Sequence, residues 1–162
     1  MNAQRSDVRQ ATVGDRADIA ALLGQLGYPS TSEACGERLR RLESSLDARA
    51  FVLDHGGRVV GLATSHVFQS IHANEPVAWL TTLVVDIDHR GHRFGRLLLD
   101  AVEELARSRG AVRVSVTSGT HRVEAHGFYE HNGYEESGVR LTKGLRGLIS
   151  PAPGSQGGIS GE

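Results

Sequence analysis

A strand–turn–helix–strand pattern in the second half of the chain most constrains the fold. The spacing of its apolar residues changes from that of a strand to that of a helix and back again. Residues 77–86 (VAWLTTLVVD) are mostly apolar, which predicts a central strand. A basic turn at 90–96 (RGHRFGR) leads into a helix from about 94 to 109 with one apolar face. Gly110 ends this helix, and the alternation in 111–118 predicts another strand. This order of elements predicts an α/β chain.

The rest of the chain consists of shorter segments with either helical or strand-like spacing of apolar residues. In the second predicted helix, Leu39, Leu42 and Leu46 should face inward. The periods predict helices at 14–27, 31–47 (with Thr31 or Ser32 as its cap) and 121–132, and strands at 7–12, at 138–146 and on both sides of His55-Gly56-Gly57.

We therefore expect one α/β domain over residues 1–149, built on a mixed, mostly antiparallel sheet of about six or seven strands with flanking helices. Residues 150–162 (SPAPGSQGGISGE) are rich in Gly, Ser and Pro. We expect a disordered tail there because the segment has almost no apolar surface to bury.

Composition excludes several classes of protein. The net charge of −1 argues against a nucleic-acid partner, which usually requires a basic excess. Cys35 is the one cysteine, which excludes an intrachain disulfide and favours a buried small hydrophobe. No apolar run is long enough to span a membrane, and the N-terminus lacks the apolar core of a signal peptide. We therefore expect a soluble, cytoplasmic protein without a membrane partner.

The 90–96 turn has the features of an anion site. A helix that begins after a glycine-containing turn directs free backbone N–H groups and its positive dipole end at one point, and three arginines add charge. These features suit a phosphate or pyrophosphate. The pattern also fits a solvated helix start, and it is neither a nucleotide P-loop nor a GxGxxG fingerprint. This motif alone therefore leaves both interpretations open.

A second motif follows at the expected interval. The turn RGHRFG (90–95) and the later AHGFYEHNGY (125–134) resemble, in order and context, the two signatures of the GNAT superfamily of acetyl-CoA-dependent N-acetyltransferases. The resemblance covers residues 7 to about 146 and implies the GNAT-like fold, with the sheet splayed between its fourth and fifth strands. Within the superfamily, the chain is loosely similar to the aminoalkylphosphonate N-acetyltransferases.

The resemblance also implies roles for individual residues. The backbone of Leu83, Val84 and Val85 would pair with the pantetheine arm of acetyl-CoA. Tyr129 would protonate the departing thiolate, and the alternative for it is a core tyrosine beside Phe128. The acetyl group would pass to the primary amine of a small molecule by direct attack in a ternary complex. The coenzyme pyrophosphate would lie on the N–H groups of Arg90, Gly91, His92, Arg93, Phe94, Gly95 and Arg96.

The chain departs from the family pattern at two places. Arg93 replaces the first glycine of the turn, and we expect it to be tolerated with a helical, negative φ. The fourth strand has Thr81 and Thr82 where many members carry a glutamate base. The base is therefore unassigned between water and three side chains, His66, His72 and Glu75.

Further interpretations concern metals, partners and activity. We expect no metal, because His66, His72 and Glu75 lack tight ligand spacing. The family pattern implies an acceptor pocket formed by the first two helices and the loop at 70–76, and a homodimer paired through the later strands. The alternatives to the small-molecule enzyme are a non-catalytic acetyl-CoA-binding regulatory module and acetylation of a protein amine.

Overall fold

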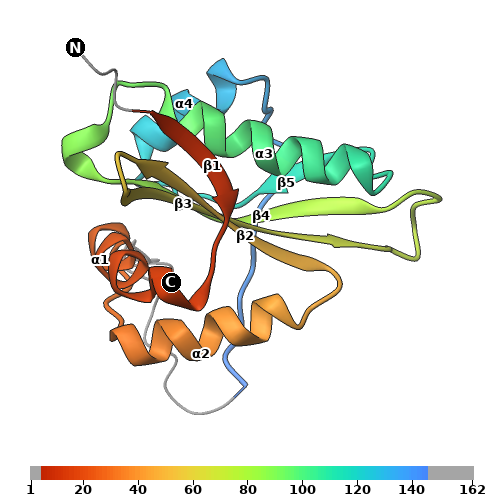
Figure 1. Ribbon diagram of the computed structural model, residues 1–162. Helices are drawn as coiled ribbons and strands as arrows, with labels where there is room; N and C mark the ends of the chain where they lie inside the picture. The colour runs from red at the N-terminus through yellow and green to blue at the C-terminus, as the bar shows by residue number, and fades with distance from the viewer. Residues whose placement is uncertain (1–4, 146–162) are drawn as a thin grey trace. The chain divides into compact units, whose positions relative to one another are not determined.

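All of the predicted strands except the one at 138–146 contribute to one sheet (Figure 1). The computed structural model describes residues 5–145. Two short 3-10 turns, η1 (Val13–Asp15) and η2 (Ile87–His89), connect longer elements. In chain order these elements are β1 (Ser6–Gln10), α1 (Arg16–Leu26), α2 (Ser32–Glu43), β2 (Ala48–His55), β3 (Arg58–Phe68), β4 (Val77–Val85), α3 (Phe94–Ser108), β5 (Val114–Val116) and α4 (Val123–His131).

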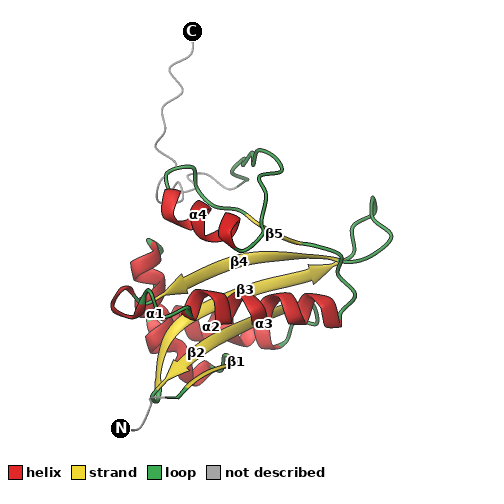
Figure 2. Ribbon diagram, turned by 90° about the horizontal axis from the view of Figure 1, so that it is seen from above, coloured by secondary structure: helices red, strands yellow, loops and turns green. Residues whose placement is uncertain are grey.

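The sheet is mixed and mostly antiparallel, as predicted. Its strand order is β1-β2-β3-β4-β5, and every neighbouring pair is antiparallel except β4 and β5. A parallel pair needs a crossover connection, which α3 supplies here. Helices α1 and α2 lie on one face of the sheet and α3 lies on the other (Figures 1 and 2).

Each face of the sheet carries its own apolar core. On the α3 side, Leu98, Leu99 and Val102 are fully buried. This helix approaches β3 so closely that a Cβ on Gly61 would lie 2.8 Å from Cδ1 of Leu98, so any larger residue there would force the buried Leu98 side chain to shift. The core under α1 and α2 includes Ile19, Leu22, Cys35, Leu39, Ala50, Val52, Leu62 and Val84. The prediction that Cys35 is a buried small hydrophobe is confirmed.

Helix α2 is shorter than its periodicity predicted. Thr31 caps it, because its Oγ1 accepts a hydrogen bond of 3.1 Å from the N–H of Ala34. The helix ends at Glu43, where Ser45 Oγ accepts bonds from the next backbone N–H groups and turns the chain into β2. Leu46 is consequently 85% exposed, and the prediction that it faces inward is wrong.

The described residues contain five strands, and the expected six or seven are not confirmed. The strand predicted at 111–118 pairs only over β5. The strand predicted at 138–146 is not found in the described residues: 138–145 have no strand conformation, and Val139 and Leu141 are 88% and 91% exposed. Residues 150–162, where the tail was predicted, lie outside the described residues.

The chain divides into two compact units, with the boundary between Val116 and Thr117. The first contains the sheet with α1, α2 and α3, and the second contains α4. None of the helices in the described part has both the length and the hydropathy to cross a membrane.

Candidate active site

The site begins on β4, whose two edges are paired to different extents. On one edge β4 pairs with β3 from Val77 to Val85. On the other edge the ladder with β5 covers three residue pairs and ends at Leu80 and Val116. In the described sheet, the backbone from Thr81 to Val85 therefore has no ladder partner on that edge. Leu83, Val84 and Val85, the residues expected to pair with a ligand, belong to this stretch.

A β-bulge lies at Thr81, where the stretch of β4 without a ladder partner on one edge begins. Thr64 pairs with Thr82 and Ser65 pairs with Leu80, so Thr81 is the extra residue on β4. The Thr81 hydroxyl donates to the carbonyl oxygen of Thr64 at 3.0 Å, and its Oγ1 lies 2.7 Å from Thr64 Oγ1. A bulge changes the alternation of side chains along a strand. Two successive threonines therefore line the same pocket, described below.

The 90–96 turn connects β4 to α3 and has two residues with positive φ. Gly91 has a φ of 82° and Arg93, the N-cap of α3, has a φ of 62°. The first i to i−4 bond of the helix runs from the N–H of Leu97 to the carbonyl of Arg93 at 3.2 Å. The N–H groups of the turn before Leu97 have no acceptor within the helix. The helix thus presents donors and a positive dipole end at this turn.

The backbone at Arg93 differs from our expectation. A negative φ was predicted, yet Arg93 alone among the described non-glycine residues has a positive one. An L-residue in the left-handed region brings its Cβ close to its own carbonyl oxygen, at a cost of about 1–2 kcal/mol. The arginine is therefore held under strain at a site that glycine would occupy without cost.

A cluster of rings holds the turn against the sheet. Phe94 is buried, with its ring centroid 5.2 Å from that of His55 on β2. The ring of His92 stacks on Phe94 at 5.5 Å, and its Nδ1 lies 3.1 Å from the carbonyl oxygen of Arg90. A carbonyl only accepts, so Nδ1 of His92 carries a proton and donates. These contacts order the turn before any ligand binds.

A buried carboxylate ties the start of the same connection to α1. Oδ1 of Asp86 accepts from the side-chain amide of Gln25 at 2.8 Å, and Oδ2 accepts from Nδ1 of His89 at 2.6 Å. Gln25 also accepts from the N–H of Ile87 at 2.9 Å. The Gln25 bond, followed by His89 and the charge of Arg58, holds the pKa of Asp86 below its usual value against the opposing effect of burial.

The three arginine side chains of the turn are engaged differently. Nε of Arg90 donates to the carbonyl oxygen of Val85 at 3.4 Å. Arg96 forms ion pairs with Asp100 and Glu103 along α3. Arg93 is exposed and has no ion pair among the described residues. The turn therefore offers its backbone and Arg93 to an anion more directly than it offers Arg96.

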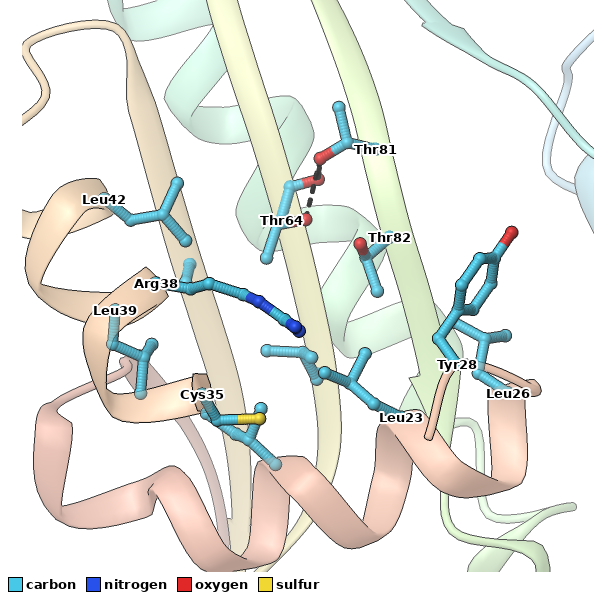
Figure 3. Close-up of a pocket in the computed structure, with 13 residues that line it drawn as sticks. Leu23, Leu26, Tyr28, Cys35, Arg38, Leu39, Leu42, Thr64, Thr81 and Thr82 are labelled. Atoms are coloured by element: carbon cyan, nitrogen blue, oxygen red, sulfur yellow. Dashed lines mark hydrogen bonds between the residues drawn. The ribbon is translucent and has the colours of Figure 1, made fainter. Parts of the chain in front are cut away.

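A pocket of about 290 Å³ lies between the helices α1 and α2 and the sheet (Figure 3). Its wall is mostly apolar and carries one charged residue among those described, Arg38. The pocket lies between the first two helices, where the acceptor pocket was predicted, whereas no residue of the loop at 70–76 lines it. The lining residues are Ile19, Leu23, Leu26, Tyr28, Cys35, Arg38, Leu39, Leu42, Ala50, Leu62, Thr64, Thr81 and Thr82.

Sequence reasoning did not single out Arg38 or Gln25. A signal existed for Arg38, because Cys35, Arg38, Leu39 and Leu42 have the i, i+3, i+4, i+7 spacing of one helix face. A polar residue in such a stripe is a candidate for function. No comparable signal existed for Gln25, since its partners Asp86 and Ile87 are 61 and 62 residues away.

Tyr129 belongs to the second unit, where the end of α4 fixes its position. Gly133 has a φ of 86°, its N–H bonds to the carbonyl of Glu130, and the N–H of Tyr134 bonds to the carbonyl of Tyr129. This is a Schellman motif, and the rings of Tyr129 and Tyr134 make its hydrophobic contact at 5.6 Å. Burial raises the pKa of Tyr129 to about 12, with Arg122 opposing. The phenol therefore stays protonated at neutral pH.

The three candidate bases lie away from the pocket wall. His66 and Glu75 are exposed, and Nδ1 of the exposed His72 lies 2.8 Å from Ser70 Oγ. None of them lines the pocket. In the described ranges, no group of three or more His, Cys, Asp and Glu side chains has the geometry of a metal site.

Comparison with protein families matches residues 19–134 to the Acetyltransferase (GNAT) family. The aminoalkylphosphonate N-acetyltransferase of Salmonella typhimurium is 30% identical over 144 residues, which cover 86% of this chain and 91% of that protein. The aminoglycoside N(6')-acetyltransferase type 1 of Stenotrophomonas maltophilia is 29% identical over 141 residues, or 85% and 91% of the two chains.

Solved structures share the fold. An aminoglycoside N-acetyltransferase in complex with CoA superposes with a TM-score of 0.78 at 16% identity, covering 88% of this chain and 96% of that one. At this identity the similarity is evidence for the fold alone. The five-stranded mixed sheet with its helices is the α/β fold of the GNAT family.

The strain at Arg93 predicts the effect of two substitutions on stability. Arg93→Gly and Arg93→Ala both remove the guanidinium, but only glycine accepts the positive φ without cost. We expect the glycine variant to be more stable than the alanine variant by about 1–2 kcal/mol in urea unfolding. Equal stabilities would show that residue 93 is not strained.

The buried carboxylate predicts a dependence on pH. Because the pKa of folded Asp86 is depressed, its contribution to stability is complete above the unfolded pKa of about 3.9 and is lost as the pH falls through the folded value. We expect Asp86→Asn to lower the free energy of unfolding by about 1–3 kcal/mol at neutral pH, and by less in acid.

Asp88 offers the matched control for this measurement. It lies on the same η2 turn and its side chain is exposed. Asp88→Asn should change the unfolding free energy by less than about 0.5 kcal/mol at either pH. An Asp86→Asn penalty that does not shrink below pH 4 would contradict the assignment.

Proposed function

Because this chain belongs to the acetyltransferase (GNAT) family, it is an acetyl-CoA-dependent N-acetyltransferase, and we propose that residues 1–149 act as one catalytic domain that acetylates a small-molecule primary amine. The observation that supports this site is that β4 lacks a ladder partner on one edge after Leu80. The strand leads directly into the 90–96 turn and the N-terminus of α3. The relatives named above transfer acetyl groups to aminoalkylphosphonates and aminoglycosides. Both are small-molecule amines.

In this proposal the cosubstrate binds along β4 and the turn. The backbone of Leu83, Val84 and Val85, which has no ladder partner on this edge, pairs with the amide groups of the pantetheine arm, as it would with an added strand. The backbone N–H groups from Arg90 to Arg96 hold the pyrophosphate, with the dipole end of α3 and the exposed Arg93 adding positive charge. Support comes from the local geometry, since this turn has the donors, the positive charge and the ordering that such a ligand needs.

Tyr129 supplies the proton in the proposed reaction. The amine nitrogen attacks the thioester carbonyl, the carbon–sulfur bond breaks, and the leaving thiolate takes a proton from the phenol. With a pKa of about 12, the phenol is a weaker acid than a thiol at about 8.5. We therefore assign its contribution mainly to hydrogen bonding to the sulfur as negative charge develops, rather than to complete proton transfer ahead of bond breaking.

The amine must lose a proton before it attacks, and the base remains unassigned. Thr81 and Thr82 occupy the stretch of β4 where many family members carry a glutamate, and neither hydroxyl is basic. His66, His72 and Glu75 are exposed and do not line the pocket. Water that enters the pocket beside the two threonines is the simplest acceptor for that proton.

The alternatives have less support. A regulatory module without catalysis is not favoured, because the named relatives are transferases and the tyrosine of the second motif is present. Acetylation of a protein amine is a weaker proposal, because the pocket of about 290 Å³ suits a small molecule. We propose that the enzyme acts in the cytoplasm, where acetyl-CoA is available.

The role of Tyr129 predicts a specific loss of rate. Tyr129→Phe keeps the ring and its contact with Tyr134 but removes the hydroxyl. With acetyl-CoA and an acceptor found by screening amines for thiol release, we expect kcat to fall at least about tenfold while acetyl-CoA affinity stays within a few-fold. Since the protonated phenol is the donor, wild-type activity should not decline through its titration until the pH approaches 12.

Tyr134→Phe is the matched control, because it removes a phenolic hydroxyl from the adjoining ring. We expect that variant to keep kcat within about twofold of the wild type. Wild-type turnover by Tyr129→Phe, under conditions where chemistry limits the rate, would remove Tyr129 from the mechanism.

We also propose that the protein is a homodimer paired through its C-terminal segment. In the second unit, Val139, Leu141 and Leu145 are each about nine-tenths exposed and alternate with polar residues between 139 and 142. An unpaired segment of this pattern adds readily to a strand of another chain. Sedimentation at micromolar concentration should give a dimer, and Leu141→Lys should shift it toward monomer. A wild-type monomer under these conditions would refute the proposal.

A further inference from the structure

We propose that the acceptor carries an anionic group at a distance from its amine, and that Arg38 in the pocket between α1 and α2 binds this group. The inference rests on the proposed function, since it names the class of amine that this enzyme acetylates. It narrows the acceptor to aliphatic amines that end in a carboxylate, phosphonate or phosphate.

The position of Arg38 is the first observation. Cys35, Leu39 and Leu42 form the inward stripe of α2, and Arg38 occupies the i+3 place of that stripe, where an apolar residue would extend the core. Its side chain points from α2 into the pocket, which it helps to line (Figure 3). Leucine at this place would pack better against the apolar wall, so packing alone does not explain the arginine.

The guanidinium is also held in place. Its Nη1 donates to Ser30 Oγ at 2.9 Å, and Ser30 Oγ donates to the carbonyl of Tyr28 at 3.2 Å. This chain of bonds fixes Arg38 to the connection between α1 and α2. No described carboxylate lies within ion-pair distance of Arg38. The remaining N–H groups of the fork are therefore available to a carboxylate or phosphonate, which guanidinium binds through paired hydrogen bonds.

The rest of the pocket wall decides what else the ligand contains. Side chains such as Leu23, Leu39 and Leu62 suit an aliphatic body. None of the described lining residues carries a carboxylate, so a second ammonium group would find no partner there. An acceptor with several positive charges is therefore disfavoured, both by this absence and by repulsion from Arg38.

The amine end follows from the position of β4. Thr81 and Thr82 line the pocket next to Leu83, where the proposed pantetheine stretch begins. Arg38 reaches the pocket from α2, on the other side (Figure 3). An acceptor that spans the pocket thus places its amine beside β4 and its anionic group at Arg38.

Four acceptors of similar length test the inference, since they differ only at the end remote from the amine: γ-aminobutyrate, aminopropylphosphonate, n-butylamine and putrescine. Direct binding is measured by calorimetry without acetyl-CoA, and kcat/KM is measured by thiol release with it. The variants are Arg38→Gln, Arg38→Lys, and Arg40→Gln as a control that removes the same charge from the same helix outside the pocket lining.

We expect the wild type to prefer at least one of the two anionic amines over n-butylamine and putrescine by about tenfold or more, in binding and in KM. Arg38→Gln should abolish this ratio, Arg38→Lys should restore part of it, and Arg40→Gln should leave it intact. The relative strength of the two anionic amines identifies carboxylate or phosphonate as the preferred group.

The outcomes separate this inference from the proposed function. Binding that depends on Arg38 without thiol release from any acceptor would support the anion site and contradict the transferase reaction. Turnover of n-butylamine or putrescine as good as that of the anionic amines, or an unchanged ratio in a folded Arg38→Gln, would overturn the anion site and leave the transferase intact.

Discussion

The unequal pairing of β4 is the constraint on which the rest of this structure depends. One edge is committed to β3 along its whole length, whereas the other is paired to β5 only as far as Leu80. A strand buried in a sheet normally satisfies its backbone groups on both edges. The backbone from Thr81 onward has no strand to pair with on this edge, which is where an extended ligand could add, and the bulge at Thr81 places this change beside the pocket.

The connection between β4 and α3 is held by stabilising contacts and also contains one strained residue. Gln25 and His89 hold the carboxylate of Asp86, and Phe94 is buried against His55, so the loop is ordered from both ends. Arg93 meanwhile keeps a positive φ that glycine would adopt without cost. Strain that persists within an ordered loop is typical of a functional site. It agrees with the proposal that the Arg93 side chain contributes charge to anion binding.

The proposed sites for the cosubstrate and for the acceptor use different kinds of group for recognition. At the turn, a helix terminus and backbone N–H groups provide donors whose position does not depend on flexible side chains. In the pocket, a single arginine held by Ser30 provides the charge on an otherwise apolar wall. Backbone recognition suits a cosubstrate that is common to a whole family. Recognition by one side chain suits the acceptor, because a single substitution can change it.

The sequence by itself determined the order of helices and strands, the turn before α3, the cap at Thr31 and the two family motifs, because each depends on neighbours within a few residues. Tertiary structure decided what local pattern could not. Residues 138–145 alternate like a strand, but no described strand pairs with them. The φ of Arg93 follows from how α3 joins the sheet, and the pKa of Tyr129 follows from burial. Gln25 and Asp86, 61 residues apart, meet only because α1 packs across the end of β4.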